Sequence, residues 1–288
     1  MPFPADKLGL RLTPCAWDMS ARAVLAYAAG LGASEAAFLD DAQGPGLRAL
    51  PFQCVSLEWP VVVSLRAALR DSLSEAEARR GVHAVQDSTF HRPIRPGDRL
   101  ETAGELVGVR AARAGVAILC RLITRDRTTG EPVTTTWTSS IYRDVVLSGE
   151  ACALAEPPAL SADQAEPPGH AAEAVTIQIA REAPHVYSEC ARIWNPIHTE
   201  RAMALAAGLP DIILHGTATW ALAGLTILRR YAECDVAALK RLTGRFSGMV
   251  IPGETITVRH EPGPSGVVRF EVRKADGGVA ISQGVAWL

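Results

Sequence analysis

The chain has 288 residues, of which 48% are hydrophobic and 21% are charged; this is a globular composition, long enough for one large domain or two small ones. Its net charge of −2 argues against nucleic acid as a partner, because phosphate binding requires concentrated positive charge. No stretch approaches the ~20 apolar residues that span a bilayer, and the N-terminus lacks a signal-peptide core. The six cysteines lie apart, without metal-ligand spacing. We therefore expect a cytoplasmic protein with no metal, no redox cofactor and no membrane contact.

The first half of the chain begins with helical sequence and continues with strands. Apolar residues recur with a helical period over 19–31 and again over 60–73. Alternation of apolar and polar residues then predicts strands over 100–109 and 116–124. A last strand carries Trp137. A helix followed by several antiparallel strands is typical of an α+β unit in which a sheet wraps one long helix.

A linker separates this half from the next. The segment 146–173 is rich in Ala, Pro, Glu and Ser and lacks a sustained apolar period, which is typical of a connection between domains. We therefore divide the chain into an N-terminal unit over 1–145, the linker, and a C-terminal unit over 174–288.

The second half repeats the order of the first. A helix is expected over 217–234 and strands over 255–260 and 267–272. Asp276-Gly-Gly predicts a hairpin turn, and a final strand carries Trp287.

One match between the halves supports an internal duplication. An offset of 156 residues aligns Phe90-His-Arg-Pro-Ile-Arg-Pro-Gly-Asp-Arg-Leu100 with Phe246-Ser-Gly-Met-Val-Ile-Pro-Gly-Glu-Thr-Ile256. Pro fixes φ and Gly permits a positive φ, so each run predicts a tight turn that opens a strand. The predicted fold is α+β, with two antiparallel sheets that each wrap a long helix.

The loop around His198 is the first chemically informative segment. Pro196 disfavours helix for Asn195 and favours a turn. Thr199 stands where it can cap a short helix over 200–207. His198 is therefore expected where a loop enters a short helix.

A second motif, His215-Gly216, lies directly before the long helix of the second half. The Gly216 N–H can bind an anion there, because it stands at the positive end of the helix. Together the two motifs suit an acyl thioester. His198 is predicted as the base or acid, Asn195 as the group that orients reactants, and the Gly216 N–H as the donor to an enolate oxygen.

These motifs resemble the signature of a known family. Asn195-Pro-Ile-His, a short helix with an acid, Gly208-Leu-Pro and Ile213-Leu-His-Gly look like the MaoC-like, (R)-specific 2-enoyl-CoA hydratase family. The first half resembles the N-terminal half of the two-domain members at 25–33, 49–52 and 91–98.

The resemblance implies a double hot-dog fold with its active site in the C-terminal half. His198, Asn195 and Gly216 match the family's catalytic positions. The degenerate N-terminal half then makes room for the acyl chain, and coenzyme A is part of the substrate rather than a cofactor. Monomer and homodimer are both compatible with two fused units.

The sequence departs from the family at one position. Members of the family normally carry an Asp five residues before the histidine, where it helps to activate water. Here that position is Ile193, which cannot transfer a proton or orient a water molecule.

Three interpretations of this loss stay open. Another carboxylate, Glu189 or Asp211, replaces the missing one; or His198 works alone or with Asn195; or the chain has lost hydration. In the third case it is a non-catalytic acyl-CoA-binding subunit or a hot-dog thioesterase.

Other polar residues have weaker predictions. Arg241 and Arg245, with Lys240, are candidates for contact with coenzyme A phosphates, or they belong to a solvated loop. His83 and His91 are expected at a surface or an interface, and His185 and Tyr187 in the pocket or at a strand edge.

The leading prediction is a hydro-lyase of fatty-acid metabolism. It would hydrate a 2-enoyl-CoA or related unsaturated acyl thioester, or dehydrate the hydrated product, with atypical chemistry because of Ile193.

Overall fold

The computed structural model describes residues 3–42, 46–263 and 266–288. The N-terminal half contains β1 (Phe3–Pro4), η1 (Ala5–Lys7), β2 (Cys15–Asp18), α1 (Ala21–Gly30), α2 (Ala36–Leu39), η2 (Pro51–Gln53), α3 (Cys54–Ala68), α4 (Glu75–Ala78), β3 (Gly81–Phe90), β4 (Arg99–Ala112), β5 (Gly115–Asp126) and β6 (Pro132–Arg143). The connecting segment contains β7 (Leu147–Ser148), β8 (Cys152–Ala153) and α5 (Ala162–Ala165). The C-terminal half contains β9 (Glu173–Gln178), α6 (Ala183–Ala191), η3 (Pro196–His198), α7 (Arg201–Ala206), α8 (Gly216–Tyr231), β10 (Arg241–Phe246), β11 (Thr255–Pro262), β12 (Val267–Lys274) and β13 (Val279–Trp287).

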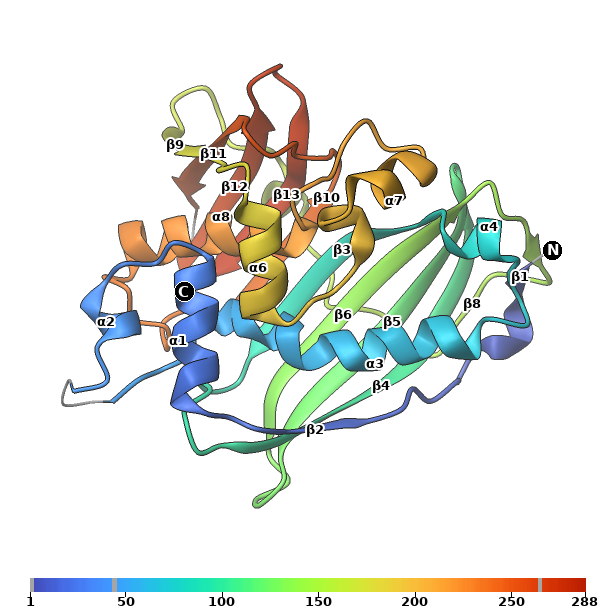
Figure 1. Ribbon diagram of the computed structural model, residues 1–288, viewed down its shortest axis with the longest axis horizontal. Coiled ribbons are helices and arrows are strands. Elements are labelled where there is room, and N and C mark those ends of the chain that lie inside the picture. Colours follow the sequence, from blue (N-terminus) through green and yellow to red (C-terminus); the bar gives the residue numbers. More distant parts are fainter. Residues whose placement is uncertain (1–2, 43–45, 264–265) are drawn as a thin grey trace.

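One antiparallel sheet runs through both halves (Figure 1). Its strand order is β2-β4-β5-β6-β3-β10-β13-β12-β11-β9, with β8 paired to β4. The order is symmetric about the junction of β3 and β10, because the strand that follows each long helix lies at the centre. At this junction Thr89 is opposite Arg241 and Val85 is opposite Arg245. The predicted α+β fold with two sheet-and-helix units is confirmed.

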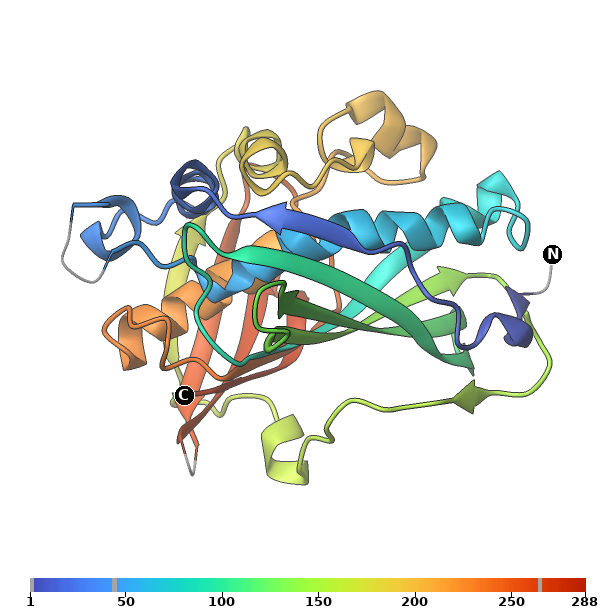
Figure 2. The same ribbon diagram turned by 90° about the horizontal axis from the view of Figure 1, so that it is seen from below.

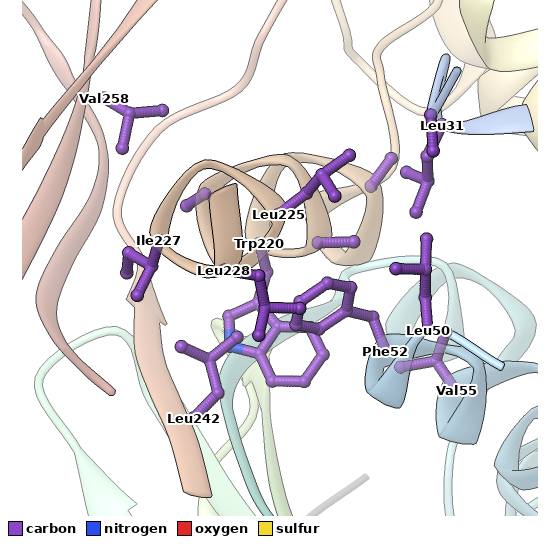
Figure 3. Packing of buried hydrophobic residues seen from close by; sticks show 14 of the residues in the cluster. Leu31, Leu50, Phe52, Val55, Trp220, Leu225, Ile227, Leu228, Leu242 and Val258 are labelled. Atoms are coloured by element: carbon purple, nitrogen blue, oxygen red, sulfur yellow. The ribbon is translucent and has the colours of Figure 1, made fainter. Parts of the chain in front are cut away.

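The long helices α3 and α8 lie on the same side of this sheet, and the two halves meet through their side chains. Figure 3 shows Phe52, from the turn before α3, beside Trp220 of α8. Their ring centroids are 5.6 Å apart in an edge-to-face arrangement, which is a favourable geometry for aromatic pairs. A Cβ on Gly224 would lie 2.3 Å from the Phe52 ring, so this close approach of the halves requires glycine.

The two Pro-Gly turns have the geometry that the sequence predicted. Gly97 has a φ of +91° and Gly253 a φ of +95°, which is the left-handed region that glycine tolerates. The strands β4 and β11 begin shortly after these turns. The hairpin glycine Gly277, between β12 and β13, also has a positive φ of 83°.

Two predicted helix starts are wrong. The helix expected over 60–73 begins at Cys54 and contains Pro60, because η2 leads directly into it and supplies its first turn. Thr199 does not cap α7. It ends η3 instead, and Glu200 occupies the N-cap position without a side-chain bond.

The connecting segment has more structure than a free linker. Its β7 pairs with β1 and its β8 pairs with β4, and Leu154 N–H donates to Val107 O at 2.7 Å. Figure 2 shows the segment crossing the face of the sheet that is turned away from α3 and α8. The backbone pairing explains why a segment without an apolar period still has a fixed course.

A buried polar cluster lies between α3 and the N-terminal part of the sheet. Glu58 accepts hydrogen bonds from Thr136 and from Gln86 Nε2, and Ser88 bonds to Thr136. Burial raises the pKa of the Glu58 carboxyl. The N-terminal half therefore encloses an acid that has polar neighbours but no paired cation among the described residues.

Candidate active site

A loop between α6 and α8 positions His198. Arg192, just after α6, has a left-handed φ of 56° that turns the chain. Asn195 is extended at the N-cap of η3, and its carbonyl accepts the His198 N–H at 3.0 Å. Pro196 begins η3, where its fixed φ suits the first helical position. His198 is consequently held at the end of one tight turn and is only 9% exposed.

The imidazole of His198 is oriented by one backbone carbonyl. Its Nδ1 lies 2.8 Å from Ile213 O, and because a carbonyl only accepts, Nδ1 carries the proton. Nε2 is then the basic nitrogen. Burial chiefly, with a smaller effect of the Arg66 charge, lowers the pKa of His198 to about 4, against the opposing effect of the bond to Ile213 O. His198 is therefore neutral at neutral pH and can accept a proton.

A second imidazole, that of His215, packs against the first. The rings of His198 and His215 are stacked with centroids 3.7 Å apart and planes 22° apart. His215 Nε2 lies 3.3 Å from Ile193 O and 3.2 Å from Ser188 Oγ. Its burial, and then the nearness of His198, lowers the pKa of His215 to about 2. His215 therefore stays neutral and holds the face of the His198 ring.

The N-terminus of α8 lies directly after this pair, at Gly216. The intrahelical bonds of α8 begin at the N–H groups of Ala218 and Thr219, which both donate to His215 O. The N–H of Gly216 precedes them at the positive end of the helix. A Cβ on Gly216 would lie 3.0 Å from the Phe246 ring, so glycine also lets β10 close against this helix start.

Comparison with known proteins identifies the family. A family model described as "MaoC like domain" matches residues 164–282, and one described as "FAS1-like, dehydratase domain region" matches residues 7–136. The chain belongs to the MaoC-like dehydratase family. It is a hydro-lyase family, as the residues 187–216 predicted.

Two relatives and one solved structure are similar along nearly the whole chain. "Probable enoyl-CoA hydratase 2" of Dictyostelium discoideum is 24% identical over 280 residues, which cover 96% of this chain and 93% of the relative. "3-hydroxyacyl-thioester dehydratase Y" of Mycobacterium tuberculosis is 27% identical over 289 residues, which cover 97% and 95%. The crystal structure of a MaoC-like dehydratase from Phytophthora capsici has a TM-score of 0.82 at 20% identity and covers 98% of this chain and 96% of that one.

The side chain of Ile193 is not part of the polar site. It is 4% exposed and belongs to the same apolar cluster as Leu214. Only its backbone takes part in the site, since Ile193 O receives the bond from His215 Nε2. An Asp at this position would place a carboxylate among apolar side chains.

The two carboxylates considered as replacements have partners elsewhere. Glu189 is exposed and accepts from Trp194 Nε1 at 3.1 Å. Asp211 accepts from the N–H of Ile212 and forms an ion pair with Arg201 at 3.2 Å. Neither contact involves an imidazole of the site.

A β-bulge brings a histidine of the N-terminal half into the site region. His83 pairs opposite Ser140 and Val85 opposite Ser139, so β3 carries an extra residue between them. Such a bulge re-aims a side chain, and the His83 ring lies 4.6 Å from the ring of Phe246. Of the two positions predicted for His83, surface or interface, the structure agrees with the interface, since His83 is half-buried on the strand that pairs with β10. No signal in the sequence indicated the bulge.

Three further polar residues from the sequence prediction, His91, His185 and Tyr187, have defined positions in the fold. His91 is exposed and bonds to Thr135 Oγ1 at 2.9 Å, as predicted for a surface group. His185 and Tyr187 lie on α6, not at a strand edge. The Tyr187 hydroxyl is buried and donates to Thr217 Oγ1 at 3.4 Å, so this side chain borders the start of α8.

The arginines proposed for phosphate contact lie on β10. Arg241 forms a buried ion pair with Asp87 at 2.6 Å and lies over the Trp287 ring at 4.3 Å. These contacts join the two halves and favour a structural role for Arg241. Arg245 is exposed on the same strand.

The described ranges contain neither a membrane-spanning helix nor a cluster of metal ligands. Within residues 3–42, 46–263 and 266–288, no helix combines the length and apolar character required to cross a bilayer. The same part of the chain holds no group of three or more His, Cys, Asp and Glu side chains arranged to bind a metal ion.

Proposed function

We propose that this chain interconverts 2-enoyl thioesters and 3-hydroxyacyl thioesters, and that His198 transfers the proton without a carboxylate partner. The names of the full-length relatives support the class of reaction. The observation that carries the proposal is the neutral His198, oriented by Ile213 O and stacked on the residue that precedes Gly216. A base and the N–H groups of a helix start are thereby placed together.

In the hydration direction, His198 Nε2 removes a proton from water while the water oxygen bonds to the β-carbon. The electron pair of the carbon–carbon double bond shifts toward the thioester and forms an enolate. The N–H of Gly216 donates to the enolate oxygen, aided by the helix dipole. The imidazolium then returns its proton to the α-carbon, so that one group makes both transfers.

A single shuttling imidazole has a stereochemical consequence. The proton leaves water and reaches the α-carbon from the same nitrogen, so the hydroxyl and the hydrogen add to the same face of the double bond. We therefore propose syn addition. Asn195, three residues before His198 in the same turn, is the candidate for positioning the water or the thioester.

The missing carboxylate sets an expectation for the rate. A general acid or base contributes roughly 10²–10⁴-fold, and the low pKa of His198 makes it a weaker base than an ordinary histidine. We expect turnover that is slower than that of a site with both groups. Coenzyme A enters only as part of the substrate.

A panel of short, long and branched 2-enoyl-CoAs tests the proposal. Loss of the enoyl absorbance and release of free thiol are followed in parallel for the parent, for His198→Gln, and for His91→Gln as an exposed control. The proposal predicts loss of absorbance without thiol, abolished only in His198→Gln. Release of thiol favours the thioesterase interpretation. Tight binding with no turnover favours the acyl-CoA-binding subunit, and both results contradict the proposal.

A further inference from the structure

The N-terminal half supplies a cation to the region of His198. Figures 1 and 2 show the loop that joins α6 to α7, which contains η3, on the same side of the sheet as α3, and Arg66 lies in the last turn of α3. The positive charge of Arg66 is close enough to lower the pKa of both His198 and His83. Arg66 is therefore a cation of the opposite half whose charge reaches the proposed base.

A tryptophan on the same helix holds this arginine. The guanidinium of Arg66 lies over the ring of Trp59, 5.1 Å from its centroid. Stacking on an aromatic face fixes a guanidinium and leaves its edge, with the N–H donors, available. Arg66 remains exposed to solvent along its side chain, so a ligand can reach it.

Arg66 has no counter-ion in the part of the chain that the structure describes. Some arginines of this half are paired, for example Arg92 with Asp98 and Asp126 and Arg79 with Glu75. Arg66 appears in no ion pair of the described residues, and the dense protein around its guanidinium lowers its pKa.

The groups that face Arg66 do not compensate its charge. His83 and His198 are both held neutral, with pKa values lowered to about 4 chiefly by burial. Tyr142, whose pKa burial raises, is neutral as well. An uncompensated cation beside neutral groups produces a positive local potential that attracts an anion.

We propose that Arg66 binds a negatively charged group of the thioester substrate. The inference rests on the proposed function in that it takes the ligand to be an acyl thioester. The anion is either a carboxylate on the acyl group or a phosphate on the carrier, since both match the planar fork of a guanidinium. A thioester without any charge would remove water from the Arg66 guanidinium and offer no anion in return. This desolvation cost disfavours such a ligand.

Binding of saturated thioesters tests this inference without turnover. The probes are butyryl-CoA, glutaryl-CoA, which adds a terminal carboxylate, and butyryl-pantetheine, which lacks phosphate and carboxylate. Dissociation constants are measured by calorimetry for the parent, Arg66→Gln and Arg66→Lys. The matched control is Arg70→Gln, which removes an exposed arginine just beyond the same helix.

Arg66→Gln is expected to weaken binding by about 10–100-fold, the usual effect of losing a charge-assisted hydrogen bond. A loss confined to glutaryl-CoA identifies the acyl carboxylate as the anion. An equal loss for both coenzyme A thioesters, with butyryl-pantetheine unaffected, identifies a phosphate. Arg66→Lys keeps the charge and should retain part of the affinity, whereas Arg70→Gln should bind as the parent does.

Two results would overturn the inference: unchanged binding of all probes by Arg66→Gln, or an equal loss for all three, including the uncharged one. Failure of the proposed function is distinguishable from both. If the parent binds these thioesters through Arg66 yet hydrates no enoyl-CoA, the reaction is refuted and the anion site stands.

Discussion

The two halves place the same elements in the same order, but they differ in the chain that leads into the long helix. In the C-terminal half this stretch carries His198 and ends at Gly216, the first residue of α8. In the N-terminal half it ends at η2, where Phe52 fills the space against α8. The sheet and the long helix are therefore common to both halves, and the loop before the helix carries the residues for which we propose a catalytic role in one half only.

The halves also differ in the polar side chains that they bury. The N-terminal half buries a carboxyl, Glu58, among side chains that hydrogen-bond to it. The C-terminal half buries the stacked imidazoles of His198 and His215, and the position five residues before His198, where the resemblance leads us to expect an acid, is apolar Ile193. Variants at these positions test whether these differences between the halves determine activity and stability.

The largest effect is expected from His198→Ala. Removal of the imidazole that Ile213 O orients, the proposed base, should lower kcat by roughly 10²–10⁴-fold. The fold should persist, because His198 lies in the loop between α6 and α8 and not in the sheet or a long helix. Initial rates of enoyl-CoA hydration measure the loss, with circular dichroism as the check of folding. A loss below tenfold would place the chemistry elsewhere.

Ile193→Asp should be destabilising. A carboxylate at this position enters an apolar cluster, and a buried unpaired charge costs about 3 kcal/mol or more. The penalty should shrink below the carboxyl pKa, because a buried acid that is protonated carries no charge. Urea unfolding at neutral and acidic pH measures it. Ile193→Val is the control, expected to cost only about 1 kcal/mol; equal stabilities for Asp and Val would contradict the placement of this side chain.

His215→Gln tests the stacked pair. Glutamine can still donate to Ile193 O but offers no ring to His198, so kcat should fall about tenfold through lost positioning while KM changes little. The pKa of His198 should rise toward its ordinary value as water reaches the ring. The pH profile of kcat/KM shows this as an acid limb at higher pH. An unchanged profile would mean that His215 only fills space.

Glu58→Gln should have the smallest effect. Burial raises the pKa of Glu58, so the folded state is favoured while the carboxyl is protonated and loses that advantage as pH rises through the raised pKa. The glutamine variant lacks this loss, so its stability relative to the parent should increase as pH rises. At low pH the free energies of unfolding of the two proteins should differ by about 1 kcal/mol or less. Thermal unfolding across pH measures it, with exposed Glu75→Gln as the control. A difference that stays constant with pH would show that the buried carboxyl does not titrate as described.

The sequence predicted what depends on local pattern. The strands β4, β5, β11 and β12 follow from alternation, and the turns at Gly97 and Gly253 follow from the need for a positive φ. The helix α8 follows from its apolar period. The positions of Asn195 and His198 at a turn and of Gly216 at a helix start agree with the sequence, whereas their catalytic roles were inferred from a family resemblance and stay predictions.

Features that depend on tertiary contacts were not predictable. His83 enters the site region through a bulge in β3, which alternation cannot reveal. In the sequence, Arg66 does not differ from other helical arginines. Only the fold shows that α3 and the loop of His198 lie on the same side of the sheet. The ion pair of Arg241 with Asp87 joins residues that are 154 positions apart, so only the fold shows that this guanidinium is occupied.

The pH dependence of kcat/KM in the parent tests the central claim most directly, namely that a neutral, buried His198 is the base. Because the pKa of His198 is lowered to about 4, the neutral form persists far below the usual range. The account predicts a constant kcat/KM from pH 8 to about pH 5, followed by a fall as one proton binds, with folding verified at each pH. A loss of activity centred near the ordinary histidine value of about 6.5, in protein that remains folded, would contradict it.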